Sequence, residues 1–308
     1  MVVCAATYKR PKSLLAMLES LAAQTAVAVG RLCVVVIDND ADGAHGLAVA
    51  RSFRSDDRLD VVVDVCPQRG ITAARNRSVE VAFQHAPDLA AVVFIDDDMT
   101  VAADWLELLV AGVAEHSAAL GSSRVEPRFE VDPPGLLLAG GYFSPPNHVR
   151  GPIALGPGTG GLLVTAAVFE RLGRAPFDDV FGLSGGEDID LLMQCRKAGF
   201  VTVWVDDAVA YELVPASRGT AAWIIARERR IGSANVLLQR RGRPGVGAEA
   251  VRVAKTAGLF AVATVALAVR RDAAARLAAR VRLARARGKL HAHLGRGAID
   301  EYTVIHGN

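Results

Sequence analysis

The sequence predicts an α/β protein in which a mostly parallel central sheet is flanked by helices and followed by a helical C-terminal extension. Three features lead to this class: short β-branched runs alternate with helix-period segments, the runs end in polar residues, and the chain after Arg218 is mainly helical in pattern. With 51% apolar residues among 308, the chain is rich enough in apolar side chains to bury one large core.

The βαβ order rests on four strand candidates separated by amphipathic stretches. Buried parallel strands are apolar throughout, and the crossover between two of them is usually a helix. The carboxyl ends of such strands share one edge of the sheet, where ligands bind. The predicted strands are Val2 to Ala6, Leu32 to Ile37, Leu59 to Val65 and Ala90 to Ile95, and the predicted helices are Pro11 to Gln24, Gly43 to Phe53 and Ile71 to His85.

The pattern changes after Gly121. A Pro- and Gly-rich stretch, 127–161, predicts long functional loops. A strand at Gly161 to Thr165, a helix at Ala166 to Leu172, a helix from Glu187 to about Ala198, and C-terminal helices broken at Gly242 to Gly245 are predicted to follow.

Bulk charge and cysteine spacing narrow the function classes. The 35 Lys and Arg nearly balance the 33 Asp and Glu, so the net charge of +2 does not favour nucleic acid as a partner. The four cysteines are far apart and predict free, buried thiols in a reducing compartment. We therefore expect a cytoplasmic protein, with peripheral contact at the inner face of the membrane as the alternative.

The C-terminal helices are basic around one apolar stretch, Ala257 to Val269. This stretch is shorter than the roughly 20 residues that a spanning helix needs, which favours a core helix or an interfacial contact. We expect these helices to dock on the preceding domain or to form a homodimer, and a peripheral contact with an anionic bilayer is the third alternative.

Three consecutive carboxylates, Asp96 to Asp98, follow the fourth predicted strand. Carboxylates packed this closely repel one another, and a divalent cation such as Mg²⁺ or Mn²⁺ relieves the repulsion with the oxygen ligands that it prefers. A solvated turn or a helix cap is the alternative, because Asp is a good capping residue.

A second acidic pair, Glu187 and Asp188, follows a Gly-Gly turn and opens a predicted helix. A helix N-terminus favours the ionised carboxylate, which a general base requires. Capping and complementation of the helix dipole would use the same residue types, so the pair alone leaves both readings open.

Taken in order, these segments resemble the inverting glycosyltransferases of family 2, which have the GT-A fold. The resemblance covers approximately 2–232, and each motif is weak alone. The matching segments are Thr7-Tyr8-Lys9-Arg10-Pro11, Val36-Ile37-Asp38-Asn39-Asp40, Gly70-Ile71-Thr72-Ala73-Ala74-Arg75-Asn76, Phe94-Ile95-Asp96-Asp97-Asp98, Gly160-Gly161-Leu162-Leu163-Val164 and Gly186-Glu187-Asp188-Ile189-Asp190-Leu191.

The resemblance implies a reaction and a set of roles. A sugar would pass from a nucleotide-diphosphate donor, with a UDP-sugar as the first choice from Asp38 and Arg75, to a hydroxyl acceptor. Asp188 would be the general base and Asp98 a ligand of Mn²⁺ or Mg²⁺. The residues expected to bind substrate are Thr7, Tyr8, Arg10, Asp38, Arg75, Asp96, Asp97, Gly161 and Glu187.

One position departs from the family pattern. Many members have a His after the last core strand, where this chain has Glu212, which would be the second metal ligand unless it pairs with Arg218. The resemblance also divides the chain into a catalytic domain, 1–217, and a helical segment, 218–308. Its donor part would be about 1–125 and its acceptor part about 126–217.

Two other functions fit less of the sequence. A non-catalytic or nucleic-acid-binding protein would act through the basic C-terminal helices, but the balanced total charge disfavours it. A nucleotidyltransferase would carry a Gly-rich phosphate loop at its first turn, where Ala5 to Tyr8 offer no glycine.

Overall fold

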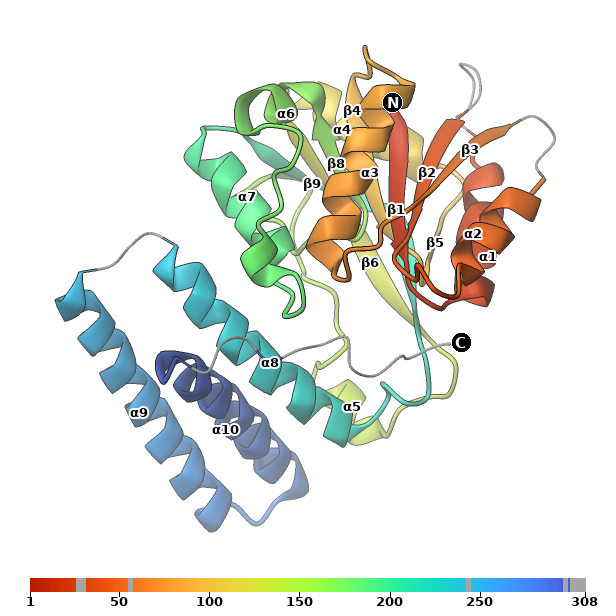
Figure 1. The fold of residues 1–308 in the computed structure, drawn as a ribbon. Helices are drawn as coiled ribbons and strands as arrows, with labels where there is room; N and C mark the ends of the chain where they lie inside the picture. The colour runs from red at the N-terminus through yellow and green to blue at the C-terminus, as the bar shows by residue number, and fades with distance from the viewer. Residues whose placement is uncertain (26–31, 55–57, 242–244, 296–298, 300–308) are drawn as a thin grey trace.

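The computed structural model describes residues 1–25, 32–54, 58–241, 245–295 and 299. An α/β domain lies beside a unit of three long helices, α8 to α10 (Figure 1). The strands are β1 Val2–Thr7, β2 Leu32–Asp38, β3 Leu59–Val65, β4 Ala91–Asp96, β5 Met99–Val101, β6 Leu120–Phe129, β7 Gly151–Ile153, β8 Leu162–Thr165 and β9 Thr202–Val214. The helices are α1 Pro11–Ala22, α2 His45–Ser52, α3 Ile71–His85, α4 Trp105–Glu115, α5 Gly135–Ala139, α6 Ala166–Leu172, α7 Glu187–Lys197, α8 Ala221–Arg240, α9 Val246–Val269 and α10 Ala273–His293, with a 3₁₀ turn η1 at Asp179–Phe181.

The strands form one mixed sheet in the order β3-β2-β1-β4-β8-β6-β9-β5, with β7 paired to β9. The first four strands of the chain are parallel, as the βαβ pattern predicts. Beyond them β8 runs antiparallel to both β4 and β6, whereas β6 and β9 are parallel. The sequence analysis did not anticipate β5, β6 or β7, and it placed Glu212 after a last core strand, whereas Glu212 lies within that strand, β9. In the described residues, β5, β7 and β8 have only antiparallel partners.

The strands β1 to β4 each supply alternate residues to two separate cores, as a period of two requires. In β1, Val3 and Ala5 face the layer of α1, α2 and α4, whereas Val2 and Cys4 face the opposite layer. On that opposite side the helices α3, α6 and α7 contribute Val79, Phe169 and Leu191 among others. Because both faces are covered, the strands read as continuous apolar runs, and the polar residues collect at their ends.

The predicted irregular stretch at 127–161 is partly regular in the structure. Its first three residues continue β6, and the short elements α5 and β7 lie within it. Pro127 pairs with Glu212 of β9 in the β6 ladder. The loops between these elements place Tyr142 to Pro146 and Pro157 to Gly160 along the cleft described below.

The C-terminal helices pack closely through two glycines. A Cβ added to Gly232 of α8 would lie 2.2 Å from the Arg285 carbonyl oxygen, and one on Gly288 of α10 would lie 1.8 Å from that of Arg229. A third apolar cluster, with Leu137 of α5, Ile224 of α8 and Leu277 and Val281 of α10, ties this unit to the loop around α5.

The prediction of a core helix at Ala257 to Val269 is wrong. The helix α9 begins at Val246 and has 24 residues, so it is long and apolar enough to cross a membrane, and only 11% of its most apolar stretch is buried. The prediction counted the uncharged residues alone, but the helix continues through Arg252 and Lys255. Of the predicted break, 242–244 lie outside the described residues, and Gly245 is the N-cap of α9. All four cysteines are free, as expected.

Candidate active site

An open cleft of about 790 Å³ lies at the carboxyl ends of β1 and β4. Its walls come from the β1 and β4 ends, the start of α7, and α8, which carries Trp223, Arg227 and Arg230 into the lining. The sequence analysis placed the start of the helical segment at residue 218, and α8, the first helix of that segment, lines one side of the cleft. Nucleotide-sized ligands bind at this edge in open α/β sheets.

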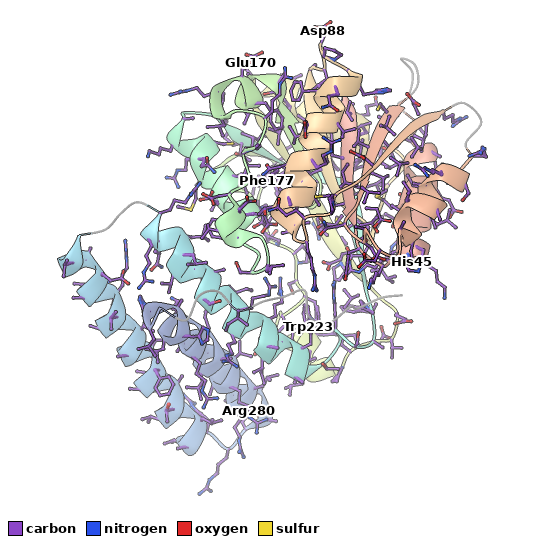
Figure 2. All side chains as sticks on the ribbon, in the orientation of Figure 1. His45, Asp88, Glu170, Phe177, Trp223 and Arg280 are labelled. Carbon is purple, nitrogen blue, oxygen red and sulfur yellow. The ribbon has the colours of Figure 1, made fainter. Side chains whose placement is uncertain are left out.

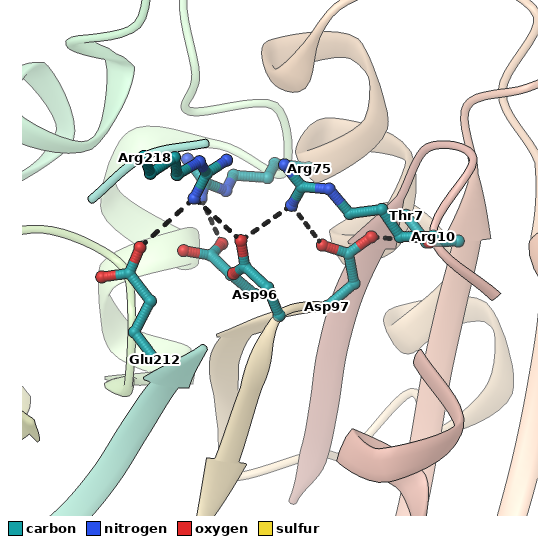
Figure 3. Close-up of polar contacts among 8 residues, drawn as sticks. Thr7, Arg10, Arg75, Asp96, Asp97, Glu212 and Arg218 are labelled. Atoms are coloured by element: carbon teal, nitrogen blue, oxygen red, sulfur yellow. Dashed lines mark hydrogen bonds and ion pairs between the residues drawn. The ribbon is translucent and has the colours of Figure 1, made fainter. Parts of the chain in front are cut away.

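Asp97 is held rigidly at the end of β4. Its Oδ2 accepts a hydrogen bond from Thr7 Oγ1 at 2.7 Å, and its Oδ1 lies 2.9 Å from Arg10 Nη1 (Figure 3). Burial raises the pKa of Asp97 to about 6, although the Arg10 guanidinium opposes the shift. The β1 and β4 turns are therefore linked by a buried ion pair.

Arg75 of α3 connects the two acidic motifs of the sequence. Its Nη2 lies 2.8 Å from Asp96 Oδ1, and its Nη1 pairs with Glu187 at the start of α7. Both Arg75 and Glu187 are buried, so the ion pair is shielded from water. One arginine thus fixes the position of the acidic helix start relative to the acidic strand end.

Asp188 lines the cleft at the first turn of α7. The chain enters this helix through Gly185 and Gly186, whose φ angles of 71° and 102° favour glycine. Gly158 faces the carboxylate so closely that an added Cβ would lie 2.6 Å from Asp188 Oδ2. Burial raises the pKa of Asp188, with the nearby Arg75 acting in the opposite direction.

The carboxylates of Asp98 and Glu212 converge on one cation. Arg218 Nη1 lies 3.2 Å from Asp98 Oδ2 and 3.4 Å from Glu212 Oε1 (Figure 3). The β5–β9 pairing brings them together, because Leu213 N donates to the Asp98 carbonyl oxygen at 2.8 Å. The sequence offered two roles for Glu212, a metal ligand and an ion-pair partner of Arg218. Both roles fall at the same place, because the Glu212 carboxylate that pairs with Arg218 also faces Asp98.

The place between Asp98 and Glu212 has the oxygen ligands that a hard divalent cation needs. The carboxylates of Asp98, in the β4–β5 turn, and of Glu212, in β9, face it, and the guanidiniums of Arg218 and Arg10 stand where positive charge is required. Burial, with the Asp98 charge next, raises the pKa of Glu212 to about 7. A cation bound between the two carboxylates would instead lower their pKa values, so Asp98 and Glu212 fit a metal ion.

Two predicted binding residues do not line the cleft in the described part of the chain. Asp38 is fully buried, and its oxygens accept from the backbone N–H groups of Asp40 at 2.9 Å and Leu47 at 2.8 Å. Gly161 has φ +73° and packs against Ser123. The neighbours Asn39 and Gly160 line the cleft instead. The other predicted residues, Thr7, Tyr8, Arg10, Arg75, Asp96, Asp97, Asp98, Glu187, Asp188 and Glu212, all do so.

Sequence reasoning missed several lining residues. Arg69 lies over the Tyr8 ring, with its guanidinium carbon 5.5 Å from the centroid. Among the described residues, the buried Thr159 hydroxyl has no hydrogen-bond partner although it lines the cleft. Only the position of Thr159 in the Gly-Pro-Gly-Thr-Gly-Gly run hinted at a role.

A group of three metal-capable side chains lies elsewhere. The ligand atoms of Cys33, Asp60 and His85 are within 4.8 Å of one another in the described residues. Cys33 and Asp60 stand at the amino ends of β2 and β3, opposite the edge that carries the cleft. His85 Nε2 already pairs with Asp60 Oδ2 at 3.0 Å, so this group is not the predicted metal site.

Fold and site together are typical of an α/β transferase that uses a nucleotide-sugar donor. Comparison with known proteins gives the family. The family model described as "Glycosyl transferase family 2" matches residues 2–172. The chain is 33% identical over 227 residues to the succinoglycan biosynthesis protein ExoM of Rhizobium meliloti (strain 1021), covering 73% of this chain and 71% of ExoM. The chain therefore belongs to glycosyltransferase family 2.

Solved structures show the same fold. The S. aureus TarS fragment 1–349 in complex with UDP matches with a TM-score of 0.54 at 14% identity, covering 96% of this chain and 91% of that one. A second structure of the TarS fragment 1–349 matches with a TM-score of 0.52 at 13% identity and the same coverage. These matches, with the family, show a GT-A fold and a glycosyltransferase enzyme.

Proposed function

We propose that the protein transfers a sugar from a UDP-sugar to a hydroxyl acceptor by direct displacement, with inversion at the anomeric carbon. The observation that carries this proposal is the Arg75 bridge, which holds the acidic end of β4 and the acidic start of α7 on one cleft. Family membership supports the reaction class, and the UDP bound in the TarS structure supports the choice of nucleotide.

The donor would lie along the β1 and β4 ends. Tyr8 and Arg69 offer a flat cationic face for the base, and Arg10, Arg218, Arg227 and Arg230 line the path of the diphosphate. Asp98 and Glu212 would hold Mg²⁺ or Mn²⁺. When bound, this ion would offset the charge of the diphosphate leaving group.

Asp188 would act as the general base. Its carboxylate accepts the proton of the acceptor hydroxyl while the oxygen forms a bond to the anomeric carbon and the bond from that carbon to the diphosphate breaks. Arg75 keeps the helix start in place, and Gly158 leaves the space beside Asp188 Oδ2 open. The acceptor would enter between the Tyr142 to Pro146 loop and α8. The free cysteines are consistent with the cytoplasm as the location.

The proposal is tested by thermal unfolding with UDP, GDP, dTDP or CDP, each with manganese or with EDTA. A ligand at about 100 times its Kd adds about 2.7 kcal/mol to the folded state, which raises Tm by several degrees. UDP with manganese should give the largest rise, and EDTA should remove most of it. No rise with any nucleotide would contradict the proposal.

Two variants focus the same measurement on the metal ligands. Asp98→Asn should lose the manganese-dependent part of the UDP shift, because one of two carboxylates is neutralised. Arg218→Gln should show a larger manganese shift than the wild type, because one of the two guanidiniums that compete for Asp98 Oδ2 is gone and only Arg10 Nη1, at 2.8 Å, remains. Arg150→Gln is the matched control, since Arg150 also pairs with two carboxylates, Glu115 and Asp207, but lies outside the lining of the cleft.

A further inference from the structure

One long helix presents an apolar surface that the described structure leaves uncovered. On α9 the exposed residues Val251, Val262, Val265 and Val269 are 53%, 66%, 61% and 70% accessible. At 100° per residue these four valines fall on one side of the helix, whereas the buried Thr256 and Ala263 face α10. An apolar helix face of this length is unusual on a surface that meets only water.

Positive charge dominates the segment that carries this face. Between 245 and 295 the sequence has ten Lys and Arg against two carboxylates, Glu249 and Asp272. Glu249 is already paired with Arg240 and His293, and Asp272 caps α10 by accepting from Ala275 N at 2.7 Å. The cations are Arg252, Lys255, Arg270, Arg271, Arg276, Arg280, Arg282, Arg285, Arg287 and Lys289.

We infer that the exposed face of α9 and the cations beside it dock on an anionic lipid bilayer. An apolar helix face rimmed by Lys and Arg binds such a surface by burying apolar side chains among the lipids while its cations meet the headgroups. Lys255 lies on this face, and the exposed Arg270 and Arg271 directly follow its last residue. This inference concerns a partner and goes beyond sugar transfer.

The packing of α9 favours a helix that lies in the membrane surface over one that crosses the bilayer. The helix α10 runs alongside α9 and carries the exposed Arg276 and Arg280, and Figure 2 places Arg280 in the part of the helical unit away from the sheet. If α9 spanned the hydrocarbon, these charges would have to enter it, which is unfavourable. Lying in the interface, α9 keeps them among the headgroups.

A second copy of the chain fits this face less well than anionic lipid. Two copies joined through α9 would bring two such cationic surfaces together. The two carboxylates of this segment already have partners within the chain, so they offer little to offset the repulsion. Anionic headgroups instead supply the missing negative charge.

The test is flotation of the full chain with vesicles of phosphatidylcholine alone or mixed with phosphatidylglycerol, without donor or metal. We expect binding to the mixed vesicles only, and weaker binding at high salt. Val262→Asp with Val265→Asp should abolish binding. Arg270→Gln and Arg271→Gln should each lower partitioning about fivefold, the factor that corresponds to about 1 kcal/mol per charge.

The matched control is Val131→Asp with Val149→Asp, which adds the same charge at valines that are 60% and 87% exposed in the α/β domain. This variant should still float with the vesicles. Unchanged Tm values for both double variants show that the fold is intact. The inference is overturned if the wild type stays in solution, if the α9 double variant still binds, or if α9 instead closes a dimer that this variant dissociates. Because no nucleotide is present, the outcome is independent of the sugar-transfer proposal.

Discussion

The acidic side chains of the cleft differ in their burial and in their hydrogen-bond and ion-pair partners. Asp97 and Glu187 are buried with arginine partners, Arg10 and Arg75, and they fix the geometry of the site. Asp188 faces the cleft, and its Oδ1 accepts a hydrogen bond from the backbone N–H of Ile189 at 2.7 Å. This position on the cleft supports the proposal that Asp188 takes the proton from the substrate.

At this scale we predict that Asp188→Asn lowers the transfer rate by about 10²- to 10⁴-fold while UDP affinity changes little, because the amide keeps the shape but cannot accept the proton. The measurement is steady-state transfer, or slow donor hydrolysis to water, together with UDP titration. Asp88→Asn is the matched control, since Asp88 lies at the far end of the domain (Figure 2) and should keep full activity. Full activity in the Asp188 variant would remove this residue from the role of base.

The raised pKa of Asp188 also predicts a pH dependence. A base must be ionised, so activity is lost as pH falls through the folded-state pKa of the carboxyl group. Burial raises that pKa, so the acidic limb of kcat should lie above the usual Asp value of about 3.9. A limb at or below that value, measured with saturating donor and metal, would contradict the assignment.

At the scale of elements, the contact between α8 and α10 depends on glycine. Gly232 and Gly288 let each helix approach the backbone of the other, and α8 in turn supplies one wall of the cleft. The Thr220 side chain caps α8 by accepting from Trp223 N at 3.2 Å, next to Arg218 at the proposed metal site. The helical unit and the cleft are thus mechanically connected.

We predict that Gly288→Ala destabilises the protein by about 1–3 kcal/mol, because the new methyl group would force the two backbones apart. Gly258→Ala is the control, because no described atom lies within 4 Å of its added Cβ. Alanine in place of glycine in a helix interior should raise the free energy of unfolding by up to about 1 kcal/mol. Urea unfolding of both variants, without lipid, measures the two changes in the free energy of unfolding. A Gly288→Ala protein as stable as the wild type would mean that the helices are not in contact there.

How much of the fold and of the site could be predicted from the sequence depends on how far apart in the chain the interacting residues lie. The strands β1 to β4, α1, α3 and α7 follow from local periodicity, and the turns that carry Thr7, Asp96 and Asp188 follow from strand and helix ends. Of the antiparallel strands, β8 was predicted, whereas β5 and β7 could not be, because they have three residues each. The buried place of Asp38 depends on α2 backbone donors that no motif reveals.

At the scale of the whole molecule, the cleft joins residues that are far apart in the chain. The Arg75–Glu187 pair links α3 to α7, and the Arg218 contacts link the loop before α8 to β5 and β9. The donor-binding strands, the proposed base and the basic helical unit are therefore held in one arrangement. A ligand at the strand ends would meet all three at once.

The most direct test is a crystal of the protein grown with UDP and manganese, with diffraction collected for anomalous scattering. The account predicts a manganese peak between Asp98 and Glu212, a diphosphate beside it, and Arg218 moved out of that position. A diphosphate bound elsewhere, or manganese at Cys33, Asp60 and His85 with none between Asp98 and Glu212, would contradict it.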